Sequence, residues 1–168
     1  MNTTSEILLI ICCIITIAMG IFIVQILLRK LRLKSESETK IKISYGIWIM
    51  SLFVAYCINT AKTIEILNEA YDTIMKVNQS DALSKILQTS SVFIGLNILW
   101  FIIWYSLSNV LSTILIGKRN IIKEMEQDNI SYFLIRGVIL VGVIISFLIL
   151  YESILRVFLP NIKVPFYY

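Results

Sequence analysis

Histidine is absent from this chain of 168 residues, and proline, glycine and cysteine occur only two, six and three times. Without histidine, the chain lacks the residue that most often binds zinc and relays protons near neutral pH. Cys12 and Cys13 are adjacent in one apolar run and Cys57 lies in another, which does not indicate a secreted disulfide framework. Glycine-rich phosphate loops and deep carboxylate pairs for acid–base catalysis are also missing. We therefore expect a protein that is not an enzyme and that uses no cofactor or metal.

Charge is also scarce: 15% of the residues are charged and 58% are apolar, with a mean hydropathy of +0.84. A charge at the centre of a bilayer costs at least about 2.5–3.5 kcal/mol, so long uncharged runs mark the membrane spans. Four such runs predict an all-α, polytopic membrane protein with four transmembrane helices in a single membrane domain, 1–168. The predicted spans are about 7–28, 43–63, 96–117 and 132–155.

Lysine and arginine are distributed unequally between the two sides of these spans, and this bias sets orientation. One side carries ten of them: Arg29, Lys30, Arg32, Lys34, Lys40, Lys42, Lys118, Arg119, Lys123 and Arg136. The other side carries five: Lys62, Lys76, Lys85, Arg156 and Lys163. Both termini should therefore lie outside the cell. The net charge of +4 is then an orientation signal and does not predict direct nucleic-acid binding.

The first connection holds most of the positive charge on the inner side. Arg29, Lys30, Arg32 and Lys34 form a candidate cytoplasmic basic patch for a protein partner or anionic lipid, although an orientation signal alone explains them equally well. The stretch 34–40 reads as a solvated loop. Isoleucine outnumbers leucine, which favours an AT-rich genome and so a bacterial inner membrane.

The second and third helices are predicted to be longer than the bilayer is thick. Lys42 to Asn78 contains no proline, and Asn78, Gln79 and Ser80 give a turn signal with Ser80 as a candidate N-cap. Arms of this length measure about 55 Å against a hydrocarbon core of about 30 Å. We expect a helical hairpin that projects on the outer side, about 64–95. The alternative is a helix break near Asn59 followed by a loose loop.

Apolar spacing predicts the seam of this hairpin. Its two sides are Ile64, Leu67, Tyr71 and Ile74 against Leu83, Ile86, Leu87 and Phe93. The aromatic residues Tyr45, Trp48, Tyr56, Trp100 and Trp104 fall near the predicted membrane boundaries, where amphipathic rings prefer to lie.

A polar stripe follows one face of the second helix. Its members include Ser44, Ser51, Asn59, Lys62 and Glu65, and the third helix adds Asn97 and Ser108. Polar groups at membrane depth must meet protein or water, so the stripe lines either a pore or a helix contact. Lys62 and Glu65, three residues apart, are placed to form an ion pair.

The fourth helix is expected from about Ser131 to Leu159, with Arg136 or Glu152 reaching a membrane interface. Gly142, Ser146 and Ser153 give it a small-residue face for a helix contact, inside the subunit or between subunits. Glu152 and Arg156 form an i,i+4 pair. The tail 162–168 is expected on the outer interface or against another subunit.

Two functions fit these features. In the first, the protein forms a homo-oligomeric channel or pore-like assembly with a polar path along the second helix. In the alternative, it is a non-conducting membrane sensor or anchor subunit of a stress, defence or immunity system. The alternative adds a cytoplasmic protein partner, and both place the chain among membrane lipids. A membrane-embedded enzyme is disfavoured because acid–base and metal-binding residues are lacking.

Overall fold

The computed structural model describes residues 3–35, 41–77 and 81–159, and these residues form helices and no strand. The helices are α1 (Thr3–Ser35), α2 (Ile43–Val77), α3 (Ala82–Ile116), α4 (Ile121–Glu126), α5 (Ile130–Ser146) and α6 (Leu148–Val157). Their order and lengths agree with an all-α membrane protein. The predicted cap at Ser80, residues 36–40 of the predicted loop 34–40 and the tail 162–168 lie outside the described residues, whereas positions 34 and 35 belong to α1.

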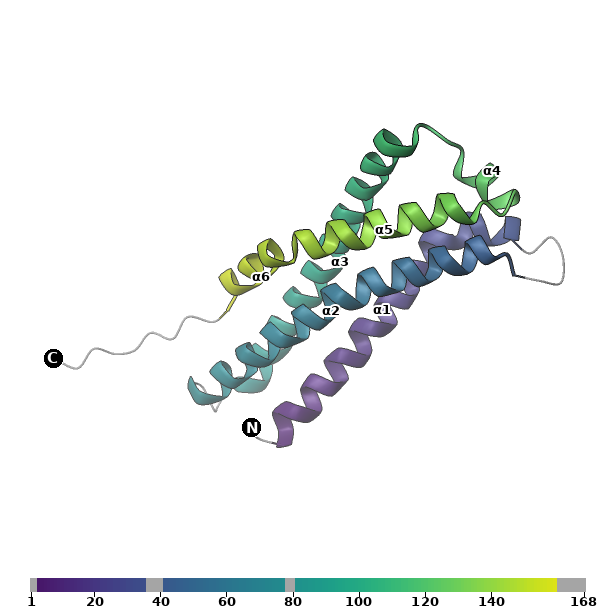
Figure 1. Ribbon diagram of the computed structural model, residues 1–168. Coiled ribbons are helices and arrows are strands. Elements are labelled where there is room, and N and C mark those ends of the chain that lie inside the picture. Colours follow the sequence, from purple (N-terminus) through teal and green to yellow (C-terminus); the bar gives the residue numbers. More distant parts are fainter. Residues whose placement is uncertain (1–2, 36–40, 78–80, 160–168) are drawn as a thin grey trace.

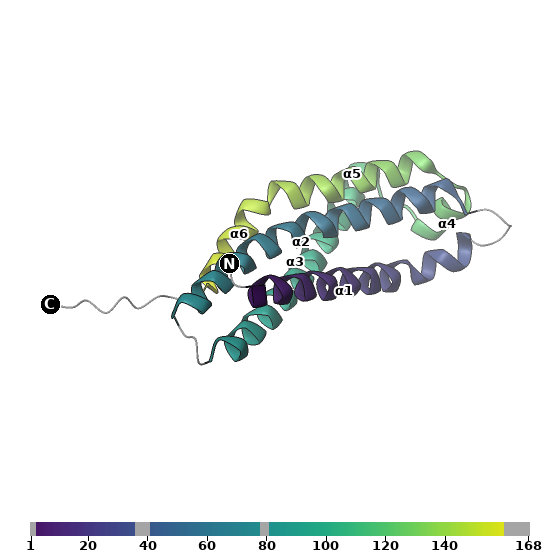
Figure 2. The same cartoon turned by 90° about the horizontal axis from the view of Figure 1, so that it is seen from below.

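The long helices run side by side in an elongated bundle (Figures 1 and 2). The start of α1 and the end of α6 lie at the same end as the end of α2 and the start of α3; we call this the hairpin end. Helix α4 lies at the opposite end, which we call the α4 end. Helix α2 packs against α1, α3, α5 and α6, so it is the central helix of the bundle.

Three stretches are long and apolar enough to span a membrane: Glu6–Arg29, Ile43–Lys76 and Ala82–Ile116. Helices α5 and α6 together meet the same requirement, with a bend of 45° between them. The described chain therefore has the helices of a multi-pass membrane protein, three as single helices and a fourth as a bent pair. Apolar side chains exposed along α1, such as Ile10 and Ile14, suit a lipid environment.

Helices α2 and α3 each contain 35 residues, or about 52 Å of helix. Because α2 is continuous through Asn59, the alternative of a helix break there is wrong. The predicted seam is right for Leu67, Ile74 and Phe93, which are buried.

Leu83 and Leu87 were predicted in that seam, and this is wrong: their side chains are 59% and 54% exposed. The buried positions of α3 are Ala82, Ile86, Ser90, Phe93, Asn97, Trp100, Phe101, Trp104, Ser108 and Ser112. The polar Ser90 belongs to this buried face and hydrogen-bonds to Tyr71 across the hairpin. Leu83 and Leu87 lie on a different face of α3 and point away from the contact between α2 and α3.

The predicted single helix from Ser131 to Leu159 is also corrected. It begins where expected, with the Asn129 side chain accepting a hydrogen bond from the Tyr132 N–H, but it bends at Phe147. No proline causes this bend. The Ser146 hydroxyl donates to the Gly142 carbonyl at 2.8 Å, a side-chain bond that competes with the helix ladder and commonly accompanies bending.

Two glycines permit close helix contacts that the sequence did not indicate. A Cβ on Gly20 of α1 would lie 2.1 Å from the Tyr56 ring, and one on Gly137 of α5 would lie 2.1 Å from Ser51 Oγ. Small residues let helix backbones approach closely inside membranes. These contacts fix α1 and α5 against the central helix.

The aromatic side chains expected near the membrane boundaries are packed inside the bundle, and their depth in a bilayer stays a prediction. Trp48, Tyr56 and Trp100 are buried, and Tyr56 meets Phe101 edge-to-face at 5.3 Å between ring centroids. The Tyr56 hydroxyl donates to the Thr16 carbonyl at 2.9 Å. Because these rings lie on faces of α2 and α3 that meet other helices, packing decides their position.

Candidate functional site

Three members of the polar stripe of α2, Ser44, Ser51 and Asn59, are enclosed by the chain itself, whereas Glu65 is exposed. Ser44 and Asn59 are fully buried and Ser51 is partly buried. The Ser44 hydroxyl contacts Met125 Sδ at 3.3 Å, and the Ser51 hydroxyl donates to the Ile47 carbonyl at 2.8 Å. The intramembrane part of the stripe therefore faces α4, α5 and α6 of the same molecule.

A buried polar cluster lies where α2, α3 and α6 meet, formed by Asn59, Thr60, Thr63, Asn97 and Tyr151. Asn97 Nδ2 donates to Thr60 Oγ1 at 3.1 Å, and the Tyr151 hydroxyl lies 3.5 Å from Asn97 Oδ1. Tyr151 also shares a 2.6 Å hydrogen bond with Thr63 Oγ1. Hydrogen bonds of this kind join helices within a membrane.

Asn59 is the exception in this cluster. Neither its Nδ2 nor its Oδ1 has a hydrogen-bond partner among the described residues, although the side chain is fully buried. The neighbouring Thr63 hydroxyl uses the Asn59 backbone carbonyl, at 2.9 Å, and not its amide. A buried amide without partners destabilises the fold, so this position is the weak point of the cluster.

At the hairpin end, five side chains form an alternating charge network that joins α2 to α6. Its members in order are Glu65, Lys62, Glu152, Arg156 and Glu69. Successive N···O distances are 2.7, 3.2, 2.9 and 2.8 Å. The predicted pairs Lys62–Glu65 and Glu152–Arg156 are both confirmed, and the link across α2 and α6 is new.

The polar residues of α3 make similar local contacts. Ser108 is buried and donates to the Tyr105 carbonyl at 3.0 Å, while Ser112 donates to the Ser108 carbonyl at 2.7 Å. Two α3 residues were proposed to line a polar path. Asn97 hydrogen-bonds to α2, whereas Ser108 hydrogen-bonds to a carbonyl of α3 itself. The structure therefore joins Asn97 to Thr60 and Tyr151 and leaves Ser108 apart from them.

Arg136 of α5 does not reach solvent as the sequence suggested; its side chain is only 4% exposed. Its guanidinium lies over the Trp48 ring, 5.0 Å from the centroid, and donates to the Tyr132 hydroxyl at 3.1 Å and to Asn109 Oδ1. Arg136 Nε has no partner among the described residues, and no described carboxylate forms an ion pair with it. This is a buried positive charge held by neutral groups.

The small-residue face of α5 and α6 makes no helix contact with the described part of the chain. Gly142, Ser146 and Ser153 are exposed, and a Cβ on Gly142 would meet nothing within 4 Å. Ser146 and Ser153 donate to backbone carbonyls of their own helix, at 2.8 and 3.0 Å. A contact between subunits at this face stays a prediction.

The candidate basic patch is described only in part. Arg29 is exposed near the end of α1, while the side chains of Lys30, Arg32 and Lys34 lie outside the described residues. Among the described residues, no group of three acidic or cysteine side chains is arranged to hold a metal ion.

Residues before α5 clasp the start of α2, which sequence reasoning missed. Asp128 Oδ1 accepts the Ser44 N–H at 2.9 Å, and Lys42 Nζ donates to the Glu126 carbonyl at 2.9 Å. The hydrogen bonds from Ser44 hold the pKa of the Asp128 carboxyl below its ordinary value. Asp128 has a positive φ of 50°, a conformation that aspartate tolerates better than most residues. The signal in the sequence was the residue type alone.

Compared with protein-family models, with curated proteins and with solved structures, the chain matches none. The functional argument therefore depends on the geometry alone.

Proposed function

We propose that this protein is a non-conducting membrane sensor or anchor subunit that acts through a partner. The observation that carries the proposal is the enclosure of the α2 polar stripe. Ser44 and Asn59 are fully buried, and Lys62 is bound to Glu65 and Glu152 of the same chain. A stripe occupied by intrachain contacts supports a structural role for these side chains more than a path for ions.

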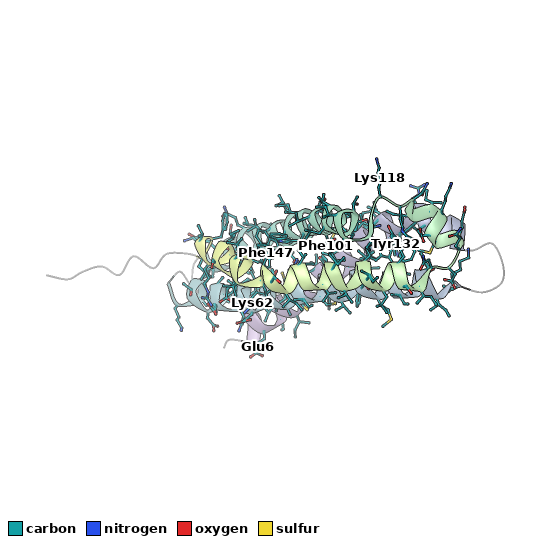
Figure 3. All side chains as sticks on the ribbon, turned by 45° about the horizontal axis from the view of Figure 1, so that its top comes forward. Glu6, Lys62, Phe101, Lys118, Tyr132 and Phe147 are labelled. Carbon is teal, nitrogen blue, oxygen red and sulfur yellow. The ribbon has the colours of Figure 1, made fainter. Side chains whose placement is uncertain are left out.

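The hairpin end offers a surface for recognition. Leu83 and Leu87 lie one helical turn apart on α3 and are exposed, in the part of the hairpin expected beyond the bilayer. In Figure 3 Glu6, near the start of α1, lies toward the same end of the molecule as Lys62. We place this end outside the cell, because the lysine-rich connection at the opposite end favours the cytoplasm.

A route from the hairpin to the α4 end runs through packed and paired groups. Glu69 of α2 binds Arg156 of α6, α6 continues into α5, and the residues before α5 hold the start of α2 through Asp128. A partner that displaced Arg156 from Glu69 would loosen the contact between α6 and α2, which Lys62–Glu152 and Thr63–Tyr151 also join. Signalling between the two ends of a bundle requires a contact with two alternative states, here the Arg156–Glu69 pair formed and the same pair broken.

Planar-bilayer recording of the purified protein tests the non-conducting part. We expect no current above that of protein-free bilayers at any voltage, from the wild type or from Lys62→Gln. An ion-selective current would overturn the proposal. It would favour the channel if Lys62→Gln alters the current and Arg29→Gln, the matched charge removal outside the stripe, leaves it unchanged.

Site-specific photo-crosslinking in cells of the native host tests the partner. A photoreactive residue at Leu87 should crosslink to one other polypeptide, and Leu83→Ser in the same chain should weaken that product. The matched position is Ile14, which is 62% exposed on α1 and should contact lipid only. Equal products from positions 87 and 14, or none from position 87, would contradict a partner at the hairpin.

A further inference from the structure

Two neighbouring cavities open at the α4 end, between α1, α3, α4 and α5. Their volumes are about 370 and 220 Å³. They share four lining residues, Tyr105, Arg119, Ile121 and Arg136. The larger is within the usual range of ligand pockets, about 300–1,000 Å³. Figure 1 shows the end of α3 splaying away from α5 and α4 on this side of the bundle.

Arg136 gives these cavities a charge that the protein leaves uncompensated. It lines both of them, its Nε has no hydrogen-bond partner among the described residues, and no described carboxylate pairs with it. An arginine carries its positive charge throughout the physiological pH range. A buried charge without a counter-ion is costly, so an ionisable residue at membrane depth marks a functional site.

Arg119 is the second cation of the site and differs from Arg136 in its pairing. Its Nη1 lies 3.3 Å from Glu124 Oε1, and its side chain is half exposed. Glu124 also accepts a hydrogen bond from Asn129, at 2.6 Å. The pair Arg119–Glu124 is neutral as a unit, so the two arginines leave one net positive charge at the cavities.

The lining residues that the two cavities do not share differ in their chemistry. Apart from the shared residues, the larger cavity is lined by Asn120 and by four apolar side chains, Leu27, Leu31, Trp48 and Ile122. The smaller cavity adds Asn109, Ser112, Thr113 and Tyr132, which carry amide or hydroxyl groups. An apolar wall beside a polar wall with one excess positive charge suits an amphiphile with one negative charge.

We propose that this site binds the phosphodiester headgroup of an anionic phospholipid, with its acyl chains along Leu27 and Leu31 of α1. Guanidinium groups bind phosphate oxygens through paired N–H donors, and basic pockets between membrane helices on the cytoplasmic side bind lipid headgroups. A zwitterionic lipid brings its own cation and leaves the charge of Arg136 uncompensated. Free inorganic phosphate has the same anionic chemistry but makes no use of the apolar wall.

The proposal is independent of the function proposed above, because it concerns the α4 end and requires no partner at the hairpin. Lys118 follows α3 close to the cavities, but Figure 3 shows it projecting away from the bundle, and it lines neither cavity. The lipid contact is therefore assigned to Arg136 and Arg119.

Native mass spectrometry of the delipidated protein in detergent tests the site, with phosphatidylglycerol, phosphatidylcholine or inorganic phosphate added in turn. We expect a single saturable phosphatidylglycerol adduct and at least tenfold weaker binding of the other two. Arg136→Gln should weaken phosphatidylglycerol binding roughly ten- to a hundredfold, the range for a lost hydrogen bond to a charged group. Arg119→Gln, a change at a half-exposed side chain, should weaken it severalfold and retain the fold.

Lys123→Gln is the matched control, since it removes an exposed positive charge from α4 without touching a cavity, and it should leave the adduct unchanged. Equal binding of phosphatidylcholine, equal loss in Lys123→Gln, or full retention in Arg136→Gln and Arg119→Gln would overturn the proposal. Inorganic phosphate that bound as tightly as the lipid would also overturn it, leaving a phosphate site only. If Arg136→Gln fails to fold, Arg119→Gln and the lipid comparison in the wild type still decide.

Discussion

The two ends of the bundle handle buried and half-buried cations in opposite ways. At the hairpin end, Lys62 and Arg156 alternate with three carboxylates in a continuous network. At the α4 end, Arg136 is more deeply buried and meets only Trp48, Tyr132 and Asn109. Arginine therefore belongs to the intrachain framework at position 156, where carboxylates surround it. At position 136, where no described carboxylate pairs with it, arginine forms a candidate anion site.

This difference also separates what holds the chain together from what remains available to a ligand. The charge network satisfies its own members, so removing one loses contacts that the chain already makes. The guanidinium of Arg136 keeps one donor unused in the described structure, so its strongest interaction is expected with a molecule from outside. Comparing variants at the two ends distinguishes these roles.

The largest expected effect on stability concerns side-chain packing at two glycines along α5. Gly137→Leu places a side chain where even a Cβ would lie 2.1 Å from Ser51 Oγ, and overpacking of this kind costs about 1–3 kcal/mol or more. Gly142→Leu, five residues nearer the hairpin end, meets open space and should leave stability unchanged. Thermal unfolding in detergent followed by circular dichroism measures both, and equal effects would show that α5 packs differently.

A second effect of similar size distinguishes two asparagines in the buried polar cluster. Asn97→Leu removes the hydrogen bond to Thr60 and one of the two hydrogen bonds of Tyr151, and should cost about 1–3 kcal/mol. Asn59→Leu removes two polar atoms that have no partner, so stability should be unchanged or higher by about 1 kcal/mol. A marked loss of stability in Asn59→Leu would mean that this amide is satisfied in solution, contrary to the structure.

A smaller effect concerns the clasp between Asp128 and the start of α2. Asp128→Ala removes an acceptor of the Ser44 N–H, and loss of such a helix cap costs about 0.5–2 kcal/mol. Because the folded state lowers the pKa of Asp128, its contribution is present above the ordinary value of 3.8 and is lost as pH falls through the lower folded pKa.

The control for this clasp is Asp128→Asn, which keeps an acceptor and removes the charge. Unfolding measured between about pH 5 and pH 3 should therefore depend less on pH in Asp128→Asn than in the wild type. Identical pH dependence in the two proteins would contradict a contribution from the ionised carboxylate.

The smallest effect is expected at the charge network. Arg156→Gln removes the link between α6 and Glu69, but both side chains are partly exposed, so the melting temperature should fall only slightly. The decrease should diminish in high salt, because salt screens exposed ion pairs. A decrease that persisted in high salt would mean that packing at α6, and not charge, holds this end.

Much of the fold could be predicted because charge and periodicity are local properties of the sequence. The gaps between charged residues predicted the long helices, and the absence of proline predicted the continuous α2. The bend at Phe147 and the exposure of Leu83 could not be predicted, since each depends on which face of a helix meets its neighbour.

The site was predicted less well for the same reason. The pair Lys62–Glu65 follows from a spacing of three residues, but the approach of Glu152 and Tyr151 to α2 depends on tertiary packing. The inward position of Arg136 was missed because an arginine near a span end ordinarily extends toward the interface. The aromatic ring of Trp48, far away in sequence, offers it a cation–π contact instead.

The claim on which the account depends is that the polar face of α2 is closed within one chain. Cysteine accessibility tests it most directly, with Ser44→Cys, Asn59→Cys and the exposed control Lys123→Cys each placed in a chain whose three native cysteines are replaced. The account predicts that a water-borne, membrane-impermeant thiol reagent, given access to both faces of opened membranes, labels position 123 and leaves positions 44 and 59 unmodified. Labelling of positions 44 and 59 at rates close to that of position 123 would show a water-filled path along α2 and contradict it.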